Sequence, residues 1–173
     1  MRRSFVYFLS AFLLLAAFGW GGIAVWAGEL PQPQGPVILT VSGGIANTNA
    51  EGVAKFDLNM LENIGLSEFT TMTAWFEDEV HFEGVLAREL LAVVAAEGKV
   101  VHARALNGYY VEIPLDDFGA YDVLLALKMN GSYMKIRDKG PIWLVYPQSA
   151  HDELDRPEIY ERWIWQLESF EVR

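Results

Sequence analysis

Short runs of alternating apolar and polar residues, separated by turn-forming residues, fill most of the chain after residue 36. Alternation with a period of two, in runs rich in β-branched and aromatic residues, is typical of strands with one buried face. Leu86 to Ala96 differs, because Leu86, Leu90, Leu91 and Val94 have helical spacing. The pattern therefore predicts one main helix and strands over residues 37–42, 53–56, 67–75, 80–82, 100–106, 109–113, 121–128, 142–146 and 163–170. This is a β-rich α+β domain with mixed sheets.

Glycine and asparagine mark the expected turns. Asn107-Gly108 and Asn130-Gly131 each stand between two apolar-patterned runs, which predicts two type I′ hairpins. Gly84 is expected to form a further turn, and the acidic stretch 76–79 is expected to be a loop. Asp57 is expected to cap a short helix that Gly65 ends.

The first 27 residues have the pattern of a secretory signal peptide. Arg2 and Arg3 precede the apolar run Phe5 to Phe18, and Val25-Trp26-Ala27 offers a cleavage site. The apolar stretch is also long enough for an uncleaved membrane anchor. We expect export to the periplasm or secretion. The expected organisation is a signal peptide (1–27), a proline- and glutamine-rich linker (28–36) and one folded domain (37–173).

The formal net charge of −10 narrows the choice of partners. Because Arg2 and Arg3 belong to the signal segment, the part from Gly28 onward carries −12. That charge disfavours nucleic acid and anionic membrane surfaces as partners. The chain has no cysteine, which excludes disulfides, a thiolate metal ligand and a thiol nucleophile.

Other familiar catalytic or metal-binding patterns are weak. The three histidines are scattered, without the spacing of a zinc site. Glu77-Asp78-Glu79 could bind a hard cation, although a solvated loop is the more common role of such a run. There is no Gly-x-Ser-x-Gly motif and no glycine-rich phosphate loop. A third hypothesis is a hydrolase or lyase that uses Asp, Glu or His in the same domain, but the sequence does not identify its catalytic residues.

Several segments in order resemble the sulfite-oxidase-like molybdopterin-binding domain. They are Phe82 to Leu86, Asn107 to Pro114, Ala126 to Gly131, Gly140-Pro141 with Leu144 to Pro147, and Trp163 to Val172. The resemblance implies that family's fold and a relation to its short exported members. It also implies a cofactor pocket, and what that pocket binds has to be argued residue by residue.

The resemblance places two cofactor-binding positions on residues that cannot do the same chemistry. The family's molybdenum-ligating cysteine falls at Thr71 or Met72, and a hydroxyl or thioether cannot replace an anionic thiolate. A cofactor-binding arginine falls at Trp143, whose indole has one donor and no charge. We therefore expect that the protein binds no molybdenum. Molybdopterin without the metal stays a possible cofactor.

The first hypothesis is an accessory module that binds a small anionic or planar ligand, or a periplasmic protein. The alternative is a molybdopterin-dependent oxidoreductase with atypical ligation, and whether the chain is an enzyme stays open. Each kind of candidate residue also has a structural role that does not involve a ligand. Cations in a surface loop are as often solvated as bound to a ligand, and aromatic residues in a β-rich domain often belong to the core. The candidate binding residues are Thr71, Thr73, Trp75, Asn107, Tyr109, Arg137, Lys139 and Trp143.

Overall fold

The computed structural model describes residues 30–173. The expected signal peptide lies outside these residues. Within them, no helix is long and apolar enough to cross a membrane.

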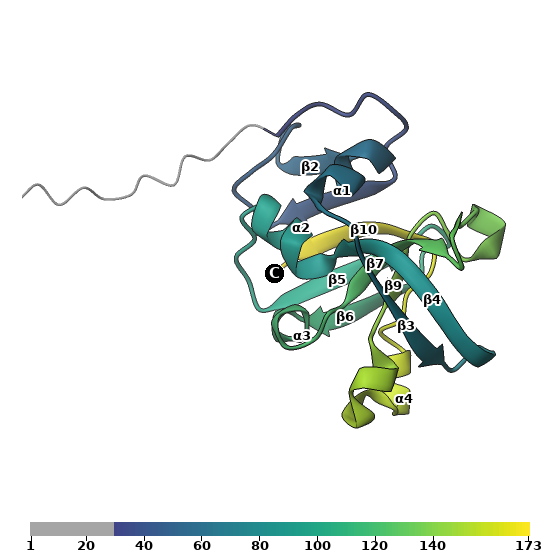
Figure 1. Cartoon of the computed structure of the whole chain (residues 1–173). Coiled ribbons are helices and arrows are strands. Elements are labelled where there is room, and N and C mark those ends of the chain that lie inside the picture. Colours follow the sequence, from purple (N-terminus) through teal and green to yellow (C-terminus); the bar gives the residue numbers. More distant parts are fainter. Residues whose placement is uncertain (1–29) are drawn as a thin grey trace, which may run out of the picture.

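Two five-stranded sheets lie against each other and build the domain (Figure 1). The first sheet has the order β2-β1-β10-β5-β6, and β1 runs parallel to β10 while all its other pairs are antiparallel. Its strands are β1 (Leu39–Gly43), β2 (Val53–Phe56), β5 (Val100–Ala105), β6 (Tyr110–Pro114) and β10 (Leu167–Val172).

The second sheet has the order β3-β4-β7-β8, and β9 pairs with the other part of β7. Its strands are β3 (Ser67–Thr73), β4 (Phe76–Leu86), β7 (Leu124–Met129), β8 (Ser132–Tyr133) and β9 (Trp143–Val145). Leu124 to Leu127 and all of β9 are buried, so these strands are covered on both faces. The observed architecture is the β-rich α+β fold with mixed sheets that the residue pattern predicts.

Short helices cover the sheets and connect them. They are α1 (Leu58–Ile64), α2 (Ala87–Val93), α3 (Leu115–Ala120), α4 (Pro157–Tyr160) and the 3-10 turns η1 (Ile136–Asp138), η2 (Gln148–Ala150) and η3 (Asp152–Leu154). The Asp57 carboxylate accepts a hydrogen bond from the Met60 amide at 2.9 Å, and Gly65 ends α1, as expected. Helix α1 contacts both β2 and β4, so it joins the two sheets.

Residues 30–36 form no helix or strand, and hydrogen bonds hold them to the domain. The amides of Gln34 and Gly35 both donate to the buried Asp57 carboxylate at 2.7 Å. Asn49 donates to the Pro31 carbonyl at 2.8 Å. These amides and that of Met60 lower the pKa of Asp57, and the Met60 contact has the largest effect.

Three expectations about the second sheet and α2 are wrong. Residues 76–79 are exposed but form the start of the long strand β4, because this part of the chain folds back antiparallel on β3 and pairs Phe76 with Thr73. Gly84 is not a turn but a strand residue at a register shift, where an added Cβ would lie 2.1 Å from the Leu125 carbonyl oxygen. Helix α2 ends at its cap Val94, before the expected limit at Ala96, because Ala95 turns to φ +49° and Ala96 pairs with Ile45.

The two Asn-Gly sequences form different turns. Asn130 and Gly131 both have positive φ (49° and 76°) and join paired residues Met129 and Ser132, as a type I′ hairpin requires. At the other site only Gly108 has positive φ, and its amide donates to the Ala105 carbonyl. That geometry is a type I turn followed by a left-handed glycine, so the second type I′ prediction is wrong.

Two strand limits near the aromatic residues also differ from expectation. Strand β3 ends at Thr73, so Trp75 belongs to the two-residue turn between β3 and β4. The closing strand begins at Leu167, so Trp163 and Trp165 precede it, and Trp165 pairs with Trp143 through an isolated bridge. As a result, Trp75 of the β3–β4 turn lies against Trp163 and Trp165 of the segment before β10.

Candidate functional site: a tryptophan-lined pocket

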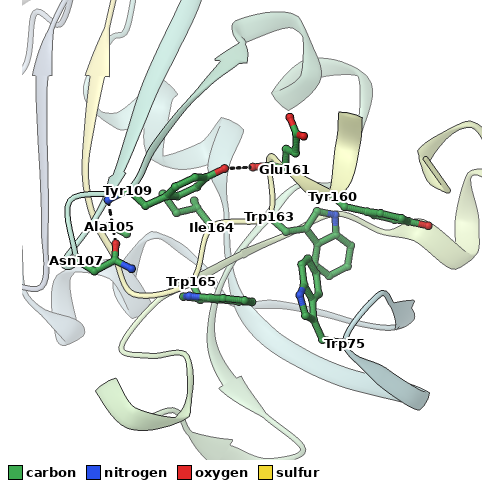
Figure 2. Close-up of a pocket in the computed structure, with 9 residues that line it drawn as sticks. All are labelled: Trp75, Ala105, Asn107, Tyr109, Tyr160, Glu161, Trp163, Ile164 and Trp165. Carbon is green, nitrogen blue, oxygen red and sulfur yellow. Dashed lines mark hydrogen bonds between the residues drawn. The ribbon is translucent and has the colours of Figure 1, made fainter. Parts of the chain in front are cut away.

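A pocket of ≈ 260 Å³ opens where the β3–β4 turn, the β5–β6 loop and the segment after α4 meet (Figure 2). Its lining residues are Trp75, Ala105, Asn107, Tyr109, Tyr160, Glu161, Trp163, Ile164 and Trp165. Its volume lies just below the roughly 300 Å³ at which drug-sized ligand pockets begin. The pocket therefore suits a molecule of one or two rings.

Local hydrogen bonds hold each wall in place. The Thr73 hydroxyl accepts from the amides of Trp75 (3.2 Å) and Phe76 (3.1 Å), which fixes the β3–β4 turn. On the opposite wall, the Asn107 side-chain oxygen accepts from the Tyr109 amide at 2.9 Å. The Tyr109 hydroxyl donates to the Glu161 carbonyl at 3.0 Å and ties the β5–β6 loop to the segment after α4.

The tryptophan rings form one continuous cluster. The Trp75 ring centroid lies 5.5 Å from those of Trp163 and Trp165 and 5.6 Å from that of Trp143. These separations are typical of favourable aromatic pairs. Trp143 is fully buried and packs edge-on against Phe82 at 5.2 Å. It therefore supports the pocket from behind and is not one of its lining residues.

Lys139 contacts the same cluster. Its ammonium nitrogen lies 3.9 Å from the Trp165 ring centroid, 5.0 Å from that of Trp143 and 5.8 Å from that of Trp75. Burial lowers the pKa of Lys139, since the rings replace part of the ammonium's water shell. Within residues 30–173 no carboxylate pairs with it.

The eight predicted residues fall into distinct groups. Trp75, Asn107 and Tyr109 line the pocket. Trp143, Thr73 and Lys139 support its walls from outside, as described above. The two others lie apart: the Arg137 side chain is 78% exposed and contacts only Asp138, and the Thr71 hydroxyl is used elsewhere.

Thr71 is fully buried, and its hydroxyl accepts a hydrogen bond from the Ser149 amide at 2.9 Å. In return, the Ser149 hydroxyl accepts from the Met72 amide at 2.8 Å and donates to Glu79 at 3.0 Å. Both positions at which the resemblance could place the metal ligand, Thr71 and Met72, thus fasten strand β3 to the η2 turn.

Sequence reasoning missed Tyr160, Glu161, Trp163 and Trp165. The alternation predicts that Trp163 and Trp165 lie within the closing strand, whereas both precede β10. The signal that could have identified them is composition, because two of the chain's six tryptophans lie within three residues here.

Two larger depressions lie elsewhere. One is a polar groove on the outer face of the first sheet, around His102, Arg104 and Glu171. The other is lined by apolar residues such as Val37, Leu106 and Ile136. Neither contains any of the eight predicted residues, whereas the tryptophan-lined pocket contains three of them.

Comparison with known proteins gives one match. The model of the oxidoreductase molybdopterin binding domain family matches residues 58–151. No curated protein matches the chain. The matched segment runs from α1 to the residue after η2 and includes all of the second sheet. Because it spans more than half of the 173 residues, the chain belongs to the oxidoreductase molybdopterin binding domain family.

Proposed function

We infer that this protein is an exported member of the molybdopterin-binding domain family that works without molybdenum. In this proposal it acts as an accessory module, and the tryptophan-lined pocket binds a small planar ligand. The observation that carries the proposal is the pocket itself, in which five aromatic rings from three separate segments surround one cavity. Aromatic walls of this kind recognise flat molecules by stacking.

The donor atoms support the part of the proposal that concerns the metal. The chain has no cysteine, and residues 30–173 hold no group of three or more His, Cys, Asp or Glu side chains that could bind a metal ion. The Thr71 hydroxyl is buried and already hydrogen-bonded. A neutral hydroxyl in that state is a poor ligand for a high-valent metal. The residues present therefore do not fit the molybdenum-bearing form of the cofactor.

Trp143, at the second cofactor-binding position, also argues against the family's usual cofactor. Trp143 lies where the resemblance places an arginine, and its ring is fully buried among other aromatic rings. Its indole nitrogen has no hydrogen-bond partner in the described residues. A buried indole supplies neither the charge nor the paired donors that a phosphate group requires.

Cofactor content is the first test. The protein is purified from its native compartment, molybdenum is measured by elemental analysis, and pterin is measured by fluorescence after oxidation. We expect neither molybdenum nor pterin in the purified protein, under conditions in which a control enzyme of the family contains both. Molybdenum in a one-to-one ratio would instead establish the oxidoreductase with atypical ligation.

Ligand binding is the second test, and adjacent tyrosines supply a matched pair of variants. Tyr109 lines the pocket, whereas Tyr110 is 65% exposed and does not. Tyr109→Ala should weaken the binding of a neutral bicyclic probe such as 2-naphthylmethanol by about three- to tenfold, the range for a lost aromatic contact. Tyr110→Ala should leave the affinity unchanged. An equal loss of affinity in both variants would argue against a small-ligand pocket. Binding of a periplasmic protein at this surface, with no binding of the probe, would argue against it as well.

Export is tested by cell fractionation and N-terminal sequencing. We expect the protein outside the cytoplasm, with a mature N-terminus at Gly28. Retention of Met1 in the membrane fraction would point to the uncleaved anchor.

A further inference from the structure

The polar side-chain atoms that face the pocket are mostly hydrogen-bond donors without a partner. The indole nitrogens of Trp75 and Trp165 form no hydrogen bond within residues 30–173. That of Trp163 is also unpaired there, but it is buried, so a ligand in the cavity does not reach it. The Asn107 amide nitrogen is likewise unused, because only its oxygen bonds to Tyr109. Figure 2 shows the Trp165 nitrogen on the side of Asn107. Such a lining favours a ligand that carries hydrogen-bond acceptors.

Two acceptors of the lining are occupied, and its one carboxylate is turned away. The Glu161 carbonyl accepts from the Tyr109 hydroxyl, and the Asn107 oxygen accepts from the Tyr109 amide. The Glu161 carboxylate points away from the tryptophans in Figure 2. A cationic ligand would therefore find no carboxylate beside the rings.

Lys139 places a positive charge against the tryptophan rings of this wall. Its ammonium nitrogen lies 3.9 Å from the Trp165 ring centroid, and Lys139 is not among the residues that line the pocket. Its backbone carbonyl accepts from the Gln166 amide at 2.8 Å, and the Gln166 side chain donates to the Ile136 carbonyl at 2.7 Å. Gln166 follows Trp165 directly, so these bonds hold the lysine and the ring together.

We propose that the pocket selects a planar aromatic carboxylate and that Lys139 is the residue that determines this charge preference. The inference rests on the proposed ligand-binding function of the pocket. A ring stacked on Trp165 would lie roughly 7 Å from the ammonium, where a unit charge changes affinity between about threefold and about fiftyfold, depending on the effective dielectric constant. The unused Asn107 amide nitrogen, on the side of the Trp165 edge, then donates to the carboxylate oxygens.

Three probes of one shape test the proposal: 2-naphthoate, 2-naphthylmethanol and 2-naphthylmethylammonium. Their affinities for the full-length exported protein are measured by calorimetry at neutral pH. We expect the anion to bind about tenfold more tightly than the alcohol, and the cation to bind most weakly. Lys139→Met keeps the apolar stem on the rings but removes the charge, so it should abolish the difference between anion and alcohol. Lys139→Arg should retain it.

Lys135→Met is the matched control, because Lys135 is an exposed cation in the same loop and does not contact the rings. It should leave the difference intact. Equal affinities for the three probes, or a difference that persists in Lys139→Met, would overturn the role of Lys139 and leave the ligand pocket standing. Failure of all three probes to bind would overturn both the inference and the proposed function.

Discussion

Lys139 shows how a single residue can be misread from sequence. Its position in a basic loop with Lys135 and Arg137 suggests a group of solvated cations or a shared anion site. The structure separates them, because Lys139 adopts φ +76° and turns its side chain onto the rings of Trp165 and Trp143. A local charge pattern carries no information about which aromatic residues the fold will bring beside it.

The lowered pKa of Lys139 predicts a pH-dependent contribution to stability. The unfolded chain keeps the ordinary lysine pKa of 10.5, while burial makes the folded protein release this proton at a lower pH. Between these two values the unfolded chain binds more protons, so this residue's contribution to stability rises with pH. Urea unfolding from pH 7 to pH 10.5 should show the wild type gaining stability relative to Lys139→Met. Lys135→Met should show no such trend, and a wild-type protein that loses stability relative to Lys139→Met would contradict the assignment.

At the residue scale, the pocket is partly predictable. Trp75, Asn107 and Tyr109 were identifiable because they stand in or next to turns that the resemblance places near a pocket. Trp163 and Trp165 were not, because their alternation suggested a regular strand. The segment instead leaves the sheet, since the Leu144 amide bonds to the Ile164 carbonyl and only one isolated bridge forms nearby.

At the scale of elements, strand positions follow from periodicity and turn geometry does not. Most predicted strands occur within a few residues of the expected limits. Both Asn-Gly sequences predict a type I′ turn. Both glycines have positive φ, but of the two asparagines only Asn130 does, and Asn107 does not. At the other site, the loop also binds the segment after α4 through Leu106 and Gln166, and that contact is a tertiary one. Tertiary hydrogen bonds thus decide between turns of equal local propensity.

The link between β3 and η2 gives a prediction at this scale. Thr71→Val keeps the volume of the side chain but leaves the Ser149 amide without its acceptor. We expect a loss of about 1 kcal/mol, at the low end of the range because Ser149 is exposed and water can reach it. Hydrogen exchange should become faster at the Ser149 and Met72 amides.

Thr70→Val is the matched control for this link. Thr70 is exposed on the same strand, and its hydroxyl contacts only His81, at 3.3 Å. Its replacement should change stability by less than about 0.5 kcal/mol. If the two variants were equally stable, the buried hydroxyl would have no special structural role.

At the scale of the whole molecule, the close approach of β4 and β7 at Gly84 is a feature on which the fold depends. The sequence predicts a turn at Gly84, but Gly84 lies in β4 and pairs with Ala126 of the neighbouring strand β7 at a register shift. A Cβ there would lie 2.1 Å from the Leu125 carbonyl oxygen and 2.7 Å from the Ala126 Cα. Periodicity cannot reveal this, because the neighbour comes from about forty residues further along the chain.

Gly84→Ala should therefore destabilise the whole domain by about 3 kcal/mol or more, because backbone atoms cannot move aside as a flexible side chain can. Gly119→Ala is the control. Gly119 lies in α3 with nothing within 4 Å of an added Cβ, and alanine favours the helix by roughly 0.5 kcal/mol. Thermal unfolding of both variants tests the pair, and a Gly84→Ala variant as stable as the wild type would show that β4 and β7 can separate without cost.

The segregation of the tryptophans also makes the molecule its own optical probe. All four tryptophans of residues 30–173 belong to the one cluster, and the first sheet contains none. Intrinsic fluorescence therefore reports only on the half of the molecule around the pocket, while far-ultraviolet circular dichroism reports on both sheets. Coincident transitions by the two signals are the standard sign of a single cooperative unit. Transitions that separate would show that the aromatic half loosens independently of the first sheet.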